Sequence, residues 1–162
     1  MTHIAPTDAA LRPSAIPWPP ILFVLALAGA WTMGSASPLP WPGLDDGPAQ
    51  IIGLGFGVLG VALIAWAAST LHRGQTTIMP NQRSDHLVTI GPYAFRRNPI
   101  YLGEVFVMFG LAEVTSNIWF VIAGLVFAVA VTWLAILPEE RHLEARFGAA
   151  WIEYKEKTRR WI

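Results

Sequence analysis

Ionisable and hydrogen-bonding side chains gather in two stretches of the sequence, and chemistry is expected there. One stretch covers residues 72–98 and the start of the apolar segment after it, and the other begins after Pro138. Carboxylates accept hydrogen bonds and protons, while arginine, tyrosine and amide side chains bind polar or charged ligands. These stretches are therefore suited to bind a polar cofactor. The candidate residues are Asp85, His86, Tyr93, Arg96, Arg97, Asn98, Tyr101, Glu104, Glu139, Glu140 and His142.

Several other kinds of chemistry are excluded or lack a supporting pattern. The chain has no cysteine, which removes disulfides, zinc–thiolate sites and thiol catalysis. His72, His86 and His142 show no metal-ligand spacing, so no metal site is predicted. No motif for a Ser or Thr nucleophile is present. A net charge of zero gives no general attraction for nucleic acid, so none is expected as a partner.

The composition indicates a membrane protein. Of the 162 residues, 54% are apolar and only 14% are charged, whereas a typical soluble domain has roughly 25% charged residues. Residues 13–44, 47–71 and 114–138 contain no Asp, Glu, Lys or Arg, and each window exceeds the about 20 residues that cross a bilayer. The sequence therefore predicts an all-α, polytopic membrane bundle of about four transmembrane helices.

The N-terminal half is expected to contain a lead and two spans. Residues 1–16 form a flexible cytoplasmic lead, and residues 17–162 form a single integral-membrane domain. A first span covers about 21–35, because prolines precede and follow it. The second span, 49–71, carries glycines that let a neighbouring helix approach closely; no strand precedes them, as a phosphate-binding loop would require. They are Gly53, Gly55, Gly57 and Gly60.

The C-terminal half is expected to contain a helical hairpin and an amphipathic helix. The apolar stretch 100–112 and a last span over 118–137 are joined by a tight turn around Thr115 and Ser116. After Pro138, apolar residues recur at three- and four-residue steps, which predicts a C-terminal amphipathic helix against the membrane or the bundle. Its apolar face consists of Leu143, Phe147, Trp151 and Tyr154.

The distribution of basic residues predicts the topology. All 11 lysines and arginines lie in the lead, in the stretch 72–98 or after Pro138. The two other connections contain only the acids Asp45, Asp46 and Glu113. By the positive-inside rule, the three basic segments share the cytoplasmic side of a bacterial inner membrane. We therefore expect four crossings with both termini in the cytoplasm.

Two sequence blocks on either side of the hairpin carry a resemblance to a known family. They are LVTIGPYAFRRNPIYLG, residues 87–103, and EERHLEARFGAAWIEYKEKTRRW, residues 139–161. In order and spacing they resemble the bipartite signature of the isoprenylcysteine carboxyl methyltransferase and phospholipid methyltransferase superfamily. The resemblance implies that residues 85–162 bind S-adenosylmethionine between loop, hairpin and tail helix. It also implies that a lipophilic methyl acceptor arrives from the bilayer, with membrane lipid as the surrounding partner.

The resemblance also implies which positions bind the cofactor. Leu87, Val88 and the tyrosine rings would form an apolar slot for adenine. Glu139 or Glu140 would accept hydrogen bonds from the ribose hydroxyls and the amino group. The complete implied cofactor site is His86, Leu87, Val88, Tyr93, Asn98, Pro99, Ile100, Tyr101 and Glu139.

Arg97, Glu104 and Glu140 are the candidates for a part in the reaction. The expected mechanism is in-line transfer of the sulfonium methyl group, promoted by positioning and by exclusion of water. An amine acceptor would need a base, for which Glu104 or Glu140 is suited. Structural explanations stay open beside these roles: Arg97 suits anionic headgroups, Glu140 the first turn of a helix, and Glu104 the membrane interface.

Two departures from the prenylcysteine enzymes bear on the acceptor. Asn98 stands where the eukaryotic enzymes carry a histidine, and an asparagine can still hydrogen-bond a cofactor. Ala135 stands where they place an arginine near the substrate carboxylate. A lipophilic amine, thiol or phospholipid headgroup is therefore expected more than a prenylcysteine carboxylate.

Two alternative functions come from other classes. NADPH-dependent membrane sterol reductases resemble the same C-terminal region, and RNPIYLGE is close to their loop, although they are usually much longer. The second alternative is a non-catalytic small membrane scaffold. Binding of S-adenosylmethionine and NADPH, measured side by side, discriminates among the three. The sequence leaves the acceptor and the oligomeric state open.

Overall fold

The computed structural model describes residues 17–42, 47–74 and 87–162. Within these ranges the chain is helical, apart from loops and one isolated bridge between Arg96 and Arg159, which confirms the all-α prediction. The predicted lead and His86 lie outside the described residues. The helices are α1 (Trp18–Ala36), α2 (Gly47–Arg73), the short 3-10 helix η2 (Gly91–Ala94), α3 (Pro99–Thr115), α4 (Trp119–Val131), the π-helical segment η3 (Thr132–Ile136), α5 (Leu137–Phe147) and α6 (Ala149–Lys157).

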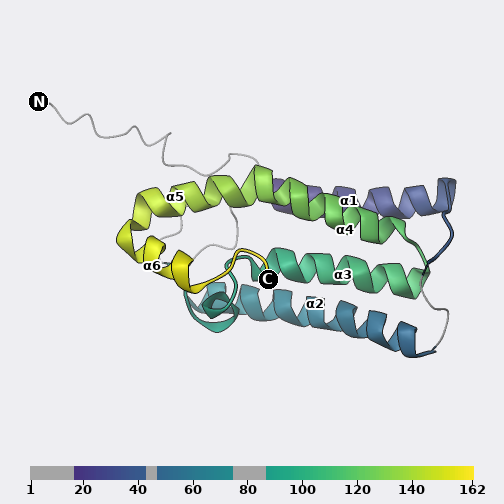
Figure 1. The fold of residues 1–162 in the computed structure, drawn as a ribbon, viewed down its shortest axis with the longest axis horizontal. Helices are drawn as coiled ribbons and strands as arrows, with labels where there is room; N and C mark the ends of the chain where they lie inside the picture. Colours follow the sequence, from purple (N-terminus) through teal and green to yellow (C-terminus); the bar gives the residue numbers. More distant parts are fainter. Residues whose placement is uncertain (1–16, 43–46, 75–86) are drawn as a thin grey trace, which may run out of the picture.

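The long helices form a bundle of two antiparallel pairs. Helix α2 packs along α3, α1 packs along α4, and contacts between α3 and α4 join the two pairs (Figure 1). Helix α4 continues without interruption through η3 into α5, which extends beyond the bundle before α6 turns back (Figure 1). The polar segments therefore gather at one end of an apolar bundle.

Three helices in the described residues are long and apolar enough to cross a membrane. They are Trp18–Ala36, Gly47–Arg73 and the continuous helix Trp119–Phe147. Helix α3 has 17 residues, slightly fewer than the about 20 needed for a crossing. The protein is thus a membrane helical bundle, and the fourth crossing stays a prediction.

The helix around Pro138 differs from the prediction. The expected break at this residue is absent, because the π-helical segment Thr132–Ile136 directly precedes the proline and the helix continues to Phe147. A proline removes one backbone donor and crowds the preceding turn, and a local π turn is one way to relieve that crowding. The last predicted span and the start of the predicted amphipathic helix are therefore one element.

The predicted amphipathic helix is in fact divided in two. Gly148 separates α5 from α6 with φ 53° and ψ −122°, a conformation that favours glycine. As a result, the expected apolar face is divided as well. Trp151 and Tyr154 on α6 are buried, whereas Leu143 and Phe147 on α5 are only half-buried.

Glycines bring α2 and α3 into backbone contact. A Cβ atom at Gly60 would lie 2.5 Å from the carbonyl oxygen of Gly103, and one at Gly110 would lie 2.6 Å from the Cα of Gly57. The predicted close approach is confirmed at these positions, whereas a Cβ at Gly55 would meet nothing within 4 Å. Helix packing in membranes depends on such small residues, since lipid provides no hydrophobic drive for association.

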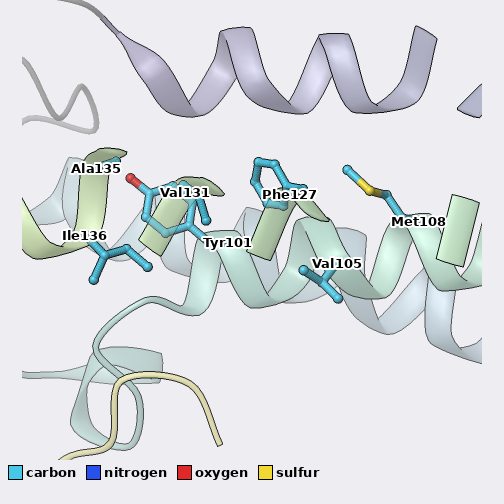
Figure 2. Close-up of a cluster of buried hydrophobic side chains, with 7 residues drawn as sticks. All are labelled: Tyr101, Val105, Met108, Phe127, Val131, Ala135 and Ile136. Atoms are coloured by element: carbon cyan, nitrogen blue, oxygen red, sulfur yellow. The ribbon is translucent and has the colours of Figure 1, made fainter. Parts of the chain in front are cut away.

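The bundle interior is a compact apolar cluster between α3 and the α4–η3 helix (Figure 2). Its members are Tyr101, Val105, Met108, Phe127, Val131, Ala135 and Ile136.

The turn of the hairpin lies at the opposite end of the bundle from the polar segments, and the prediction for it is confirmed. Ser116 there adopts the left-handed conformation, and the Asn117 side chain accepts a hydrogen bond from the Trp119 amide at 3.1 Å.

Candidate functional site

All basic residues that the structure describes lie at the end of the bundle that carries α5 and α6. This end, called here the basic end, also contains the last turn of α2, the loop before α3 and the C-terminal segment (Figure 1). The predicted grouping of basic segments is thus present in the described part of the chain. The assignment of the basic end to the cytoplasm stays a prediction of the positive-inside rule.

A C-terminal strap, residues 158–162, lies along the loop that precedes α3. The Arg97 amide donates to the Arg159 carbonyl at 2.9 Å, and the Asn98 side-chain amide donates to the Arg160 carbonyl at 3.1 Å. The Arg97 guanidinium donates to the Thr158 carbonyl. Because these bonds use backbone carbonyls, they depend on the path of the strap more than on its side chains.

Arg97, Glu140 and Arg160 form an ion cluster beneath this loop. Glu140 Oε1 accepts from Arg97 Nε at 3.2 Å and from Arg160 Nε at 3.0 Å, and Oε2 accepts from Arg160 Nη2 at 2.6 Å. The hydrogen bonds to Glu140 raise the pKa of Arg160. The side chains of Arg97 and Glu140 are each only 9% exposed, so each charge requires its partner. Arg97 and Glu140, two of the predicted catalytic residues, therefore form an ion pair with each other.

Tyr93 and Tyr154 connect the loop with α6. The Tyr154 hydroxyl donates to the Tyr93 carbonyl at 2.8 Å. Burial, and after it the negative charge of Glu139, raises the pKa of Tyr93. Burial raises the pKa of Tyr154 to about 12, against an opposing effect of Arg97. Both phenols therefore keep their protons at neutral pH, and the Tyr154 hydroxyl uses its proton in the bond to the Tyr93 carbonyl.

Glu104 and Glu139 are acids without a hydrogen-bond or ion-pair partner among the described residues. Glu104 Oε2 is buried and has no hydrogen-bond partner in the part of the chain that the structure describes. Glu139 is half-buried and, among the same residues, makes no hydrogen bond or ion pair. Both carboxylates interact electrostatically with Tyr101, and Glu139 also interacts with Tyr93. We call Glu104 and Glu139 the acidic pair.

Tyr101 lies between the acidic pair and the bundle interior. Its side chain is 9% exposed, and its hydroxyl end is directed from α3 toward the helix that carries Ala135 (Figure 2). Tyr101 and Glu104 are three positions apart on α3, which places them on one helix face. The acids therefore line a region whose remaining surface is aromatic and apolar.

The other predicted cofactor residues surround this region less directly. Leu87 and Val88 are half-buried in the loop, Pro99 is buried in the first turn of α3, and Ile100 packs against the central apolar cluster. Asn98 uses its side-chain nitrogen to bind the strap. In the structure, Glu139 interacts electrostatically with Tyr93 and Tyr101. The Asn98 side chain is instead hydrogen-bonded to the strap.

Three residues at the basic end have roles that sequence reasoning missed. Arg160 shares Glu140 with Arg97, Tyr154 holds the loop, and the Trp161 indole donates to Thr132 Oγ1 at 3.1 Å. Trp151, only 2% exposed, has an indole N–H without a hydrogen-bond partner in the described ranges. The basic residues after Pro138 were interpreted only as a topology signal, and the sequence offers no spacing that identifies these partners.

The fold and the site define an integral-membrane helical protein with an acidic, aromatic region at one end. The chain belongs to the phospholipid methyltransferase family, whose family model matches residues 48–150. Comparison with curated proteins and with solved structures finds no match. By family the protein is a membrane methyltransferase. The matched range includes α2, the loop, the hairpin and α5, whereas α1 and the strap lie outside it.

Proposed function

We propose that the protein transfers the methyl group of S-adenosylmethionine to a lipophilic acceptor at the cytoplasmic face of a bacterial inner membrane. The observation that carries this proposal is the acidic pair: Glu104 and Glu139 both interact electrostatically with Tyr101, and neither has a hydrogen bond or ion pair among the residues that the structure describes. S-adenosylmethionine carries positive charge on its sulfonium and its amino group. Carboxylates and tyrosine rings attract such cations, most strongly where water is scarce.

The same charges argue against the two alternatives. NADPH carries several negative phosphate oxygens, which the carboxylates of the acidic pair would repel, and Arg97 and Arg160 already bind Glu140. A scaffold without a ligand gains nothing from two half-buried acids, because partial desolvation of a carboxylate without a partner destabilises the folded state. The acidic pair is therefore better explained by a cationic ligand.

The charges at the basic end also bear on the acceptor. A carboxylate acceptor would need a cationic partner, and Ala135 is a buried, uncharged member of the apolar cluster. The Arg97 guanidinium is already engaged by Glu140 and by the carbonyls of Lys155 and Thr158. We therefore favour an amine, a thiol or a phospholipid headgroup as the group that receives the methyl.

For an amine acceptor the acids also provide a base. The methyl carbon leaves the sulfonium sulfur and bonds to the nitrogen, and the amine must release one proton. Glu104, on α3 and free of hydrogen bonds within the described ranges, is suited to accept it. Glu140 is less suited, since both of its oxygens accept hydrogen bonds from arginine.

Binding and transfer assays on the purified full chain in lipid nanodiscs test the proposal. We expect saturable binding of S-adenosylmethionine and no binding of NADPH under the same conditions. Labelled methyl groups should then appear in bacterial lipid extract or on small lipophilic amines or thiols. Binding of NADPH alone would contradict the proposed cofactor, and methyl ester formation on a prenylcysteine analogue alone would contradict the proposed acceptor.

A further inference from the structure

Trp161 attaches the C-terminal strap to the far side of the bundle. Its indole Nε1 donates to Thr132 Oγ1 at 3.1 Å, and its ring packs against the apolar cluster that contains Tyr101. Thr132 in turn donates from the same oxygen to the Ala128 carbonyl at 2.6 Å. The hydroxyl thus acts as acceptor for the strap and as donor within its own helix. The next residue, Ile162, is 76% exposed.

The strap contacts each element that carries the proposed site. It accepts hydrogen bonds from Arg97 and Asn98 in the loop before α3, and its Arg160 side chain binds Glu140 on α5. Through Trp161 it reaches Thr132, the first residue of the π-helical segment that links α4 to α5. Figure 1 shows the C-terminal end of the chain beside the start of α3.

The strap connects the two segments that carry the acidic pair. Glu104 lies on α3 and Glu139 on α5, the helix that continues from η3, and α3 and η3 also pack against each other in the apolar cluster. The strap hydrogen-bonds to the loop that begins α3 and, through Arg160, to Glu140, the neighbour of Glu139. A strap held at Trp161 therefore adds a connection between the loop before α3 and the helix that carries Glu139.

We propose that Trp161 and Thr132 are a positioning pair for the cofactor site, although neither is expected to touch the cofactor. The proposal rests on the proposed function for the identity of the ligand. It adds a segment outside residues 48–150, the range matched by the family. The π-helical turn that begins at Thr132 agrees with it, since single π turns are frequent at functional sites.

The test is a double-mutant cycle with binding of S-adenosylmethionine as the readout. Trp161→Phe removes the indole donor but keeps most of the ring packing, and Thr132→Val removes the hydroxyl at nearly constant shape. We expect each variant to weaken binding about three- to tenfold, the range of one net hydrogen bond. The double variant should be no weaker than either single one, and Thr132→Ser should restore binding.

Matched controls separate positioning from general loosening of the helices. Thr115→Val removes a hydroxyl that donates to the Leu111 carbonyl at 2.6 Å in an exposed turn, and Trp31→Phe changes an indole that is 63% exposed. Both should bind the cofactor like the wild type. If Thr132→Val and Trp161→Phe also bind like the wild type, the strap only packs and the proposal is wrong.

Hydrogen exchange of the Arg97 amide provides a second readout that needs no ligand. This amide donates to the Arg159 carbonyl, so loosening the strap should speed its exchange in Trp161→Phe and Thr132→Val and not in the controls. A wild-type protein that fails to bind S-adenosylmethionine would contradict the proposed function. Hydrogen exchange of the Arg97 amide would then test whether Trp161 and Thr132 position the strap. An exchange rate that is unchanged in Trp161→Phe and Thr132→Val would overturn that role.

Discussion

Arg97 and Glu140 meet at 3.2 Å across 43 residues of sequence, one from the loop before α3 and the other from α5. Each side chain is only 9% exposed, so neither charge is well solvated. Because Arg160 binds the same carboxylate, both oxygens of Glu140 are used. The neighbouring acid, Glu139, has no such partner among the described residues and interacts electrostatically with Tyr93 and Tyr101. Adjacent glutamates on one continuous helix thus have different surroundings.

Replacing Glu139 should weaken cofactor binding. In Glu139→Ala we expect the affinity for S-adenosylmethionine to fall by about 1.5 to 3 kcal/mol, the scale of a hydrogen bond to a charged group. Isothermal titration of the nanodisc-embedded variant measures this. Glu144→Ala is the matched control, since Glu144 is an exposed acid on the same helix whose ion pair within the described ranges is with exposed Lys155. Equal affinities for Glu139→Ala and the wild type would remove Glu139 from the site.

Replacing Glu140 should instead reduce stability. Glu140→Ala leaves Arg97 and Arg160 without their shared carboxylate, and we expect a loss of about 3 kcal/mol, the lower end of the range for breaking a buried pair. Thermal unfolding in detergent measures the change. Glu153→Ala, which removes an exposed pair with Lys157, should have no measurable effect. A stable Glu140→Ala variant that binds cofactor but transfers no methyl group would show a catalytic role instead.

The glycine contact between α2 and α3 predicts opposite effects at two positions. In Gly103→Ala the new methyl would lie 2.7 Å from the Gly60 carbonyl oxygen, so the helices must separate and the melting temperature should fall. In Gly55→Ala the methyl meets nothing within 4 Å, and helix propensity favours alanine by about 1 kcal/mol. The melting temperatures of both variants, measured by thermal unfolding in the same detergent, test this difference. Equal tolerance of alanine would contradict close packing at Gly103.

The topology prediction is tested with reporters. A tag at either terminus should be accessible from the cytoplasm, and a reporter at Asp45, outside the described residues, should be periplasmic. The physical reason is that all 11 lysines and arginines fall in three segments, which resist translocation. Alkaline phosphatase and green fluorescent protein fusions give opposite signals on the two sides. A cytoplasmic signal at Asp45 would refute four crossings with both termini inside.

The sequence by itself determined the class of protein and the turn of the hairpin. Long uncharged windows predict membrane-spanning helices, because the length of an apolar segment can be counted directly along the chain. Ser116 and Asn117 form the hairpin turn because turn geometry depends on a few adjacent residues. The loop and the acids at the basic end were also predicted from the sequence, through its resemblance to a family signature whose two blocks have a fixed order.

The pairing of charges was decided only by the tertiary structure. Nothing in the sequence around them distinguishes Glu139 from Glu140. Yet Glu140 is bound by two arginines, whereas Glu139 interacts electrostatically with Tyr93. The continuation of the helix through Pro138, its division at Gly148 and the contact of Trp161 with Thr132 were likewise not evident. These features depend on residues brought together from distant parts of the chain. A hydrophobic pattern records which side chains avoid water, but not which polar groups will meet.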